Sequence, residues 1–158
     1  MSLISITNEL IVSNVKESID FYKNTFNFEI EYTDGSPITW AQLKKDEVRI
    51  MLEDYATVKE EINIFPEKVK SCNLIKFEYD NYNEFKNLYD NCKNNLCSFF
   101  IDYNETDYGK IEFGVLDIDD NMILISFRKW LYLKVKRSDN MNGEKSFSNS
   151  HINWVMEE

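Results

Sequence analysis

Glycine, proline and histidine are all scarce in this chain of 158 residues, which contains 4 Gly, 2 Pro and a single His. So few glycines and prolines exclude a collagen-like or low-complexity chain. Hydrophobic residues make up 43% of the chain and aromatic residues 15%, which is enough for a buried core and excludes disorder for most of the length. The length fits one domain, or two small modules that share a core.

Positive charge is also in deficit, because 18 Lys and Arg stand against 28 Asp and Glu, giving a formal net charge of −10. Binding to a nucleic-acid backbone needs clustered cations, so we expect no nucleic-acid partner. An acidic surface favours cationic ligands over anionic ones. The charge therefore narrows the class of ligand without identifying one.

Long apolar runs and secretion signals are absent as well. No stretch approaches the roughly 18 apolar residues of a membrane-spanning helix. The opening sequence MSLISITNELIVSNV lacks the basic start of a signal peptide. We therefore expect no membrane partner and a cytoplasmic protein. The three cysteines lack metal-site spacing and are expected to be reduced thiols; they are Cys72, Cys92 and Cys97.

The first third of the chain predicts one strand followed by a helix and three more strands. Apolar residues of one parity within 4–12 are typical of a strand. Asn14 is a suitable N-cap for a helix through VKESIDFYKNTF, where apolar residues recur at helical spacing. Three further strands are expected at 28–32, 39–43 and 48–53.

The same order recurs after a polar connector at residues 54–73. A strand at 74–79 precedes Asp80, which takes the capping place of Asn14, and the apolar helix positions repeat at a constant offset of 66 residues. One βαβββ unit leaves a sheet face uncovered and needs a partner. A second unit in the same chain therefore indicates that the two units pack together. The predicted fold class is α+β, with two βαβββ modules at 4–53 and 74–128. The last three strands are expected at 98–103, 111–116 and 122–127.

Two stretches resemble a known family. LIVSNVKESIDFYKNTFNFEI resembles the opening strand and helix of the vicinal oxygen chelate superfamily, which includes glyoxalases, extradiol dioxygenases and bleomycin-resistance proteins. YGKIEFGVLDIDDNMILI resembles its closing hairpin, in which an Asp-x-Asp-x-Asn turn recurs. The chain departs from the family pattern at Asn27 and Asp120, where Gly is usual, and at Ile118, where Pro is usual.

The resemblance covers about residues 4–128. It implies that the sheets of the two modules curl into an open, barrel-like cleft, which is often completed in a homodimer. Residues 1–128 would then form a glyoxalase/bleomycin-resistance-like domain, and 129–158 would be a C-terminal extension whose role the sequence does not assign.

Metal-dependent members of this superfamily take ligands from the first strand of each module and from the last strand of the second. The corresponding positions here are near Thr7, Leu74 and Leu124, and leucine cannot bind a metal. The single histidine, His151, lies outside both motifs. We therefore expect no metal, no cofactor and no catalytic residue. The resemblance is then closest to the metal-free bleomycin-resistance branch.

Strand parity predicts which side chains would line the cleft. Where alternate residues of a strand are apolar and face the helix, the intervening residues face the other way. The resemblance also points to Tyr108 and Glu112 of the closing motif, because this motif lies nearest the binding face in the resistance-protein branch. The same alternation is also what a simply solvated antiparallel sheet shows. The predicted ligand-binding residues are Trp40, Arg49, Met51, Glu53, Tyr108 and Glu112.

These features favour metal-independent binding, or sequestration, of a small cationic or aromatic compound, similar to that of bleomycin-resistance proteins. Trp40 would stack on the compound and carboxylates would pair with its charge. Two alternatives stay open. One is an atypical lyase, transferase or dioxygenase of the same superfamily, and the other is a non-catalytic interaction module whose extension docks on a partner.

Overall fold

The computed structural model describes residues 7–62 and 74–131. The first module comprises β1 (Asn8–Val12), α1 (Val15–Phe26), β2 (Glu29–Asp34), β3 (Trp40–Lys45) and β4 (Val48–Asp54). The second comprises β5 (Leu74–Tyr79), α3 (Tyr82–Asn94), β6 (Phe99–Glu105), β7 (Lys110–Leu116) and β8 (Met122–Arg128). The described part of the segment between the modules, up to residue 62, contains the helix α2 (Tyr55–Glu61).

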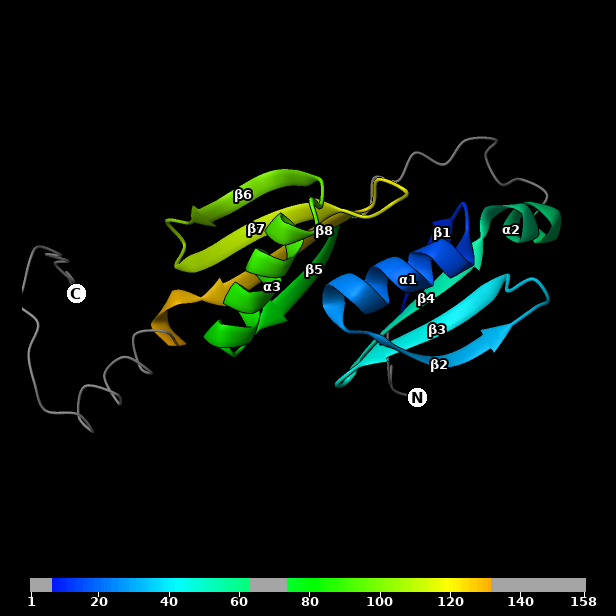
Figure 1. Ribbon diagram of the computed structural model, residues 1–158, viewed down its shortest axis with the longest axis horizontal. Coiled ribbons are helices and arrows are strands. Elements are labelled where there is room, and N and C mark those ends of the chain that lie inside the picture. Colours follow the sequence, from blue (N-terminus) through cyan, green and yellow to red (C-terminus); the bar gives the residue numbers. More distant parts are fainter. Residues whose placement is uncertain (1–6, 63–73, 132–158) are drawn as a thin grey trace, which may run out of the picture.

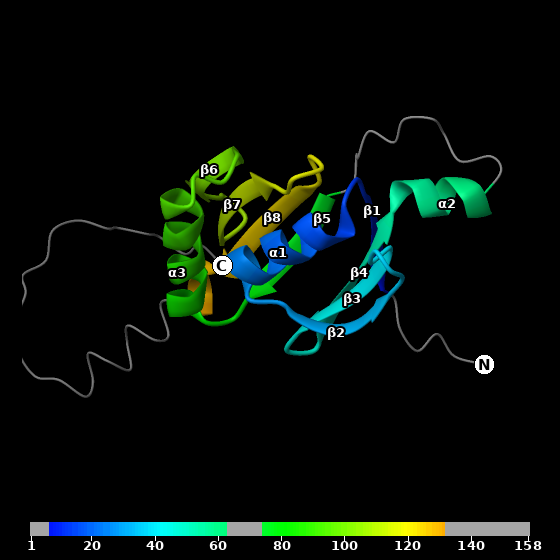
Figure 2. The same cartoon turned by 45° about the vertical axis from the view of Figure 1, so that its right-hand side comes forward.

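Each module is a four-stranded mixed sheet with a helix on one face (Figures 1 and 2). The strand order is β1-β4-β3-β2 in the first sheet and β5-β8-β7-β6 in the second. In both, the first strand pairs in parallel with the last, and the other pairs are antiparallel. The predicted α+β class and βαβββ repeat are confirmed, and the two sheets stay open without closing into a barrel.

The predicted connector contains a helix that the sequence analysis missed. α2 begins directly after β4, because the Asp54 side chain accepts hydrogen bonds from the backbone N–H groups of Ala56 and Thr57 (2.9 and 3.2 Å). Val58, only 4% exposed, anchors the helix. A helix of 7 residues is too short for its apolar spacing to show among polar neighbours.

Asparagine caps begin the two long helices. Asn14 accepts from the N–H of the third helical residue (3.2 Å), as predicted. At α3 the prediction is wrong by one residue, because the cap is Asn81 and not Asp80. The side chain of Asn81 accepts from the second and third helical N–H groups (2.9 and 3.3 Å). Asp80 precedes the cap by one position, outside the place from which a side chain satisfies these donors.

The two places where the chain lacks the usual glycine keep a glycine-like backbone. Asn27 has φ 59° and Asp120 has φ 63°, both in the left-handed region. Asn and Asp enter this region more readily than other residues with a side chain. At the end of α1, the N–H of Asn27 also donates to the carbonyl of Lys23 (3.1 Å). Both turns therefore keep a left-handed residue although neither has a glycine there.

One hydrophobic core extends across both modules. α1 packs on β3 and β4, α3 packs on β5 and β8, and the two helices contact each other. Phe26, fully buried in α1, places its ring 5.4 Å from that of Phe77 in β5, and Phe28 lies 5.8 Å from the same ring. The C-terminal end of α1 thus packs against the second module as well as its own sheet.

The turn between β7 and β8 joins the two modules by polar contacts. The Tyr22 hydroxyl of α1 donates to the buried carboxylate of Asp117 (3.0 Å). Asp117 also accepts from the backbone and the side chain of Asn121 (both 2.8 Å). Asp119 accepts from the N–H of Ser13, which directly precedes the α1 cap (3.1 Å). The Asp-x-Asp-x-Asn motif therefore holds the turn together and ties it to the first module.

The pairing of Tyr22 with Asp117 gives a prediction for alkaline pH. Burial, reinforced by the Asp117 carboxylate, raises the pKa of Tyr22 well above its ordinary value of 10. The folded state then holds this proton more tightly than the unfolded chain, so its stabilisation is complete below about pH 10 and is lost as the pH rises towards the folded pKa. Urea unfolding between about pH 8 and about pH 11 should show a shallower decline in Tyr22→Phe than in the wild type. An unchanged slope, matching that of the exposed control Tyr32→Phe, would contradict this.

No helix among the described residues is both long and apolar enough to span a membrane.

Candidate functional site

Among the described residues, α1 packs on one face of the first sheet, against β3 and β4. Side chains of Ala41, Leu43, Ile50 and Leu52, each at most 1% exposed, form the covered face. Because side chains alternate along a strand, the intervening residues of β3 and β4 point to the face away from α1. We call this opposite face the open face of the first sheet.

Trp40 of β3 lies on the open face of the first sheet. Its indole N–H donates to the carboxylate of Glu9 in β1 (3.2 Å). Since β4 lies between β3 and β1, the indole must extend across β4. Met51 and Glu53 of β4 point to the same face, and Glu53 is the register partner of Trp40. Three of the predicted residues therefore form one continuous surface, with a half-buried tryptophan fixed across it.

Arg49 points to the same face from the other end of β4, but its guanidinium already has a partner. It donates to both carboxylate oxygens of Glu31 in β2 (2.8 and 3.0 Å), and Gln42 donates to the same carboxylate (2.6 Å). The guanidinium and then the amide hold the pKa of Glu31 below its ordinary value. Arg49 therefore contributes a neutralised ion pair to this end of the face.

Tyr108 and Glu112 lie in the second module and contact each other. The Tyr108 hydroxyl donates to the Glu112 carboxylate (2.6 Å), and this hydrogen bond raises the pKa of Tyr108 above its ordinary value. Tyr108 is 66% exposed, whereas Glu112 is only 7% exposed. The structure thus places this pair on a different sheet from Trp40, with the carboxylate enclosed.

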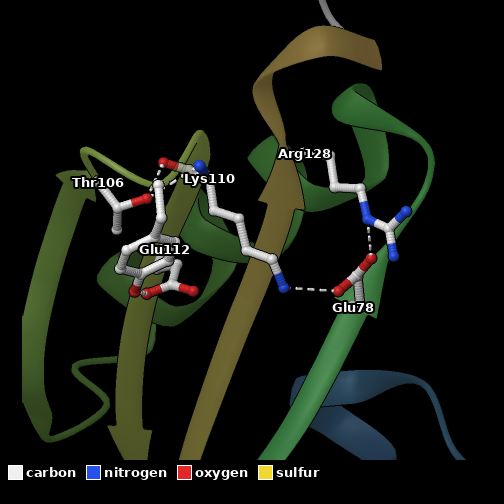
Figure 3. A network of polar contacts seen from close by, with 6 residues as sticks. Glu78, Thr106, Lys110, Glu112 and Arg128 are labelled. Atoms are coloured by element: carbon white, nitrogen blue, oxygen red, sulfur yellow. Dashed lines mark hydrogen bonds and ion pairs between the residues drawn. The ribbon is translucent and has the colours of Figure 1, made fainter.

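An ion-pair network stands beside Glu112 (Figure 3). Lys110 extends across β8 to reach Glu78 in β5 (2.7 Å), and Arg128 pairs with the other oxygen of the same carboxylate. Lys110 and then Arg128 hold the pKa of Glu78 below its ordinary value. The Thr106 hydroxyl accepts from the N–H of Lys110 (2.9 Å) and donates to its carbonyl (3.0 Å), and the Thr106 N–H donates to the same carbonyl (2.8 Å). The charge of Glu78 is therefore compensated within the chain by Lys110 and Arg128.

The face of the second sheet away from α3 is more enclosed than strand alternation suggests. Leu124 and Ser126 are 7% and 4% exposed, although both alternate with core residues of β8. Phe100 of β6 lies directly over Gly114, since a Cβ built on this glycine would be 2.4 Å from the ring. The chain's own side chains thus cover part of this face.

The resemblance implies metal-ligand positions near three residues that carry no carboxylate, imidazole or thiol. Thr7 is exposed, Leu74 is 46% exposed and Leu124 is buried. Within 7–62 and 74–131, no group of three or more His, Cys, Asp or Glu side chains is placed to hold a metal. His151 falls outside the described residues, so metal-free action stays a prediction.

A pocket of about 400 Å³ lies at the seam between the modules. Apolar side chains from both modules line it, including Phe28, Ile50 and Ile75, and Arg49 is also among the lining residues. The sequence analysis did not find this pocket, because it arises where the β3–β4 hairpin meets β5, which is a contact between modules. No pattern within one strand or helix would reveal it.

The family model of the Glyoxalase/Bleomycin resistance protein/Dioxygenase superfamily matches residues 4–125, and the chain belongs to this superfamily. No curated protein sequence matches the chain significantly. The match confirms the superfamily predicted from the two motifs.

Solved structures share the fold. TioX from Micromonospora sp. ML1 is 12% identical with a TM-score of 0.63, covering 78% of this chain and 97% of TioX. A glyoxalase/bleomycin resistance protein/dioxygenase family enzyme from Burkholderia phytofirmans PsJN is 17% identical with a TM-score of 0.66, covering 77% and 96%. Lactoylglutathione lyase from Agrobacterium tumefaciens is 14% identical with a TM-score of 0.65, covering 80% and 95%. At these identities, the likeness concerns the fold alone.

Proposed function

We propose that this chain binds a small aromatic, positively charged compound on the open face of the first sheet, without a metal and without converting it. The observation that carries this proposal is the fixed position of Trp40. Its hydrogen bond to Glu9 holds the indole across β4 before any ligand arrives. A ring that is already ordered loses little conformational freedom on binding, which favours affinity.

The surroundings of Trp40 suit a cationic aromatic ligand. Met51 supplies a polarisable thioether, and Glu9 and Glu53 bring carboxylates to the same face. A cation over an indole gains about 0.5–2 kcal/mol, whereas an exposed ion pair gains only about 0–1 kcal/mol. Most of the affinity should therefore come from stacking on Trp40, with the carboxylates favouring the charge of the ligand.

We also propose that the chain forms a homodimer, in which a second copy completes the ligand-binding cleft that the family resemblance implies. In a single chain, the face of the second sheet away from α3 exposes apolar side chains, among them Leu74 (46%) and Phe100 (36%). A homodimer would cover such surface, and the superfamily likeness implies one. Sedimentation equilibrium should show a dimer at micromolar concentration. A monomer over the whole concentration range would contradict the dimer and leave the Trp40 site to be tested alone.

Binding at Trp40 predicts a large effect of one substitution. In calorimetric titrations with bleomycin and with ethidium, a planar aromatic cation, we expect saturable binding that weakens at least about tenfold in Trp40→Ala. The loss corresponds to about 1.4 kcal/mol, as expected for stacking and cation–π contacts. Trp130→Ala removes another tryptophan of the described chain, 47% exposed, and is the matched control.

Three outcomes would contradict the proposal. One is no binding of either probe at millimolar concentration, and another is an equal loss of affinity in Trp40→Ala and Trp130→Ala. The third is chemical conversion of the bound compound, which would favour an atypical enzyme of the superfamily.

A further inference from the structure

Two cysteines meet where α3 ends. The N–H of Cys97 donates to the carbonyl of Cys92 (3.0 Å), and the N–H of Leu96 donates to the carbonyl of Lys93 (3.2 Å). Leu96 lies in the left-handed region with φ 54°. These features define a Schellman motif, in which the side chains at the two ends of the longer loop commonly contact each other. Here both of those side chains are cysteines.

The backbone hydrogen bonds of this motif bring Cys92 and Cys97 together. Both thiols are free, and each is the first cause of the shift in the pKa of the other. Cys92 is fully buried, whereas Cys97 is partly exposed. An accessible thiol beside a second, buried thiol is the usual arrangement of a pair that can be oxidised reversibly.

The pKa values of the two thiols are shifted in opposite directions. The hydrogen bond from Cys92, helped by the backbone N–H of Cys97 and by Thr25, lowers the pKa of Cys97 to about 7. The same contact, together with burial, raises the pKa of Cys92. The lowered pKa of Cys97 favours its nucleophilic thiolate near neutral pH, and the raised pKa of Cys92 favours its thiol.

We propose that Cys92 and Cys97 are a modification site, at which a hydroperoxide forms a reversible intramolecular disulfide. The Cys97 thiolate attacks one peroxide oxygen, so that an S–O bond forms, the O–O bond breaks and the departing hydroxide takes up a proton to become water. The sulfur of Cys92 then gives up its proton and attacks the sulfur of Cys97. The S–S bond forms as the S–O bond breaks and a second water leaves. Two thiols and one hydrogen peroxide thus give one disulfide and two waters.

The disulfide would form at the contact between the two helices. The side-chain amide of Asn91, next to Cys92, donates to the carbonyls of Asn24 and Thr25 at the end of α1 (3.4 and 3.3 Å). Oxidation would therefore change the structure next to the place where α3 of the second module contacts the C-terminal end of α1 in the first. Amide NMR signals of Thr25 should shift on oxidation and return on reduction.

The test uses the full chain with Cys72→Ser, so that Cys92 and Cys97 are the two remaining thiols. After treatment with hydrogen peroxide, intact mass should fall by two hydrogens, peptide mapping should join Cys92 to Cys97, and dithiothreitol should reverse both. In the reduced protein, iodoacetamide should alkylate Cys97 at least about tenfold faster than Cys92, with a half-maximal rate near pH 7.

Single variants assign the roles of the two sulfurs. Cys92→Ala should accumulate a sulfenic acid at Cys97 that dimedone traps, and Cys97→Ser should resist peroxide. If Cys92→Ala does not fold, mapping in the Cys72→Ser chain decides alone. The proposal is overturned if both thiols survive peroxide that oxidises glutathione, or if Cys97 is driven to sulfinic acid while Cys92 stays a thiol.

Discussion

Replacing Asp117 by alanine is expected to lower the free energy of unfolding by at least about 3 kcal/mol. Asp117 is 6% exposed and accepts hydrogen bonds from the Tyr22 hydroxyl, from the N–H of Asp119, and from the backbone and side chain of Asn121. Without the carboxylate, several buried donors lose their partner, and each unpaired donor costs about 1–3 kcal/mol. Urea denaturation of wild type and variant measures the difference.

The matched control for this prediction is Asp120→Asn in the same turn. Asp120 is exposed, and Asn tolerates its left-handed backbone, so the free energy of unfolding should change by less than about 0.5 kcal/mol. In the double variant of Tyr22→Phe and Asp117→Ala, the loss should be smaller than the sum of the single losses, because the two side chains share a hydrogen bond. Additive losses, or a loss below about 1 kcal/mol in Asp117→Ala, would show that this turn does not hold the modules together.

Phe26→Ala is expected to lower the free energy of unfolding by about 3–5 kcal/mol. The ring is fully buried and contacts the rings of Phe21, Tyr22 and Phe77. Since Phe77 belongs to β5, the cavity should weaken the seam as well as the packing of α1. Hydrogen exchange should therefore become faster in β5 as well as in the first module.

Phe100→Ala is the control for a phenylalanine outside the core. Its ring is 36% exposed and lies over Gly114, so its removal should cost only about 1 kcal/mol. If Phe26→Ala were no more harmful than Phe100→Ala, or if β5 kept its protection, α1 would not be the element that joins the modules.

The sequence predicted the architecture because its signals are local. Strand alternation and helical spacing depend on residues a few positions apart, and the constant offset between the two halves revealed the repeat. Where a signal was weak, the prediction was wrong: α2 is too short to show a period, and the cap of α3 is Asn81 in place of Asp80. The first strand, expected at 4–12, begins only at Asn8, and the ends of several other strands differ by one or two residues from the expected bounds.

The site could be predicted only in part. Parity correctly placed Trp40, Met51 and Glu53 on one face, because alternation follows from the backbone alone. It could not show that Arg49 reaches across β3 to Glu31, or that Glu112 is enclosed beside Tyr108. These contacts depend on which strands become neighbours and on side-chain rotamers, and the seam pocket depends on how the modules pack. Whether the predicted residues bind a ligand stays a prediction.

The most direct test of metal-free binding at Trp40 is a tryptophan-fluorescence titration of the metal-stripped protein with bleomycin, at low and at physiological salt. We predict saturable quenching that weakens as salt rises, because carboxylates contribute to the site. The quenching should persist in excess chelator and disappear in Trp40→Phe. Quenching that appears only after a divalent metal is added, or that Trp40→Phe retains in full, would contradict the account.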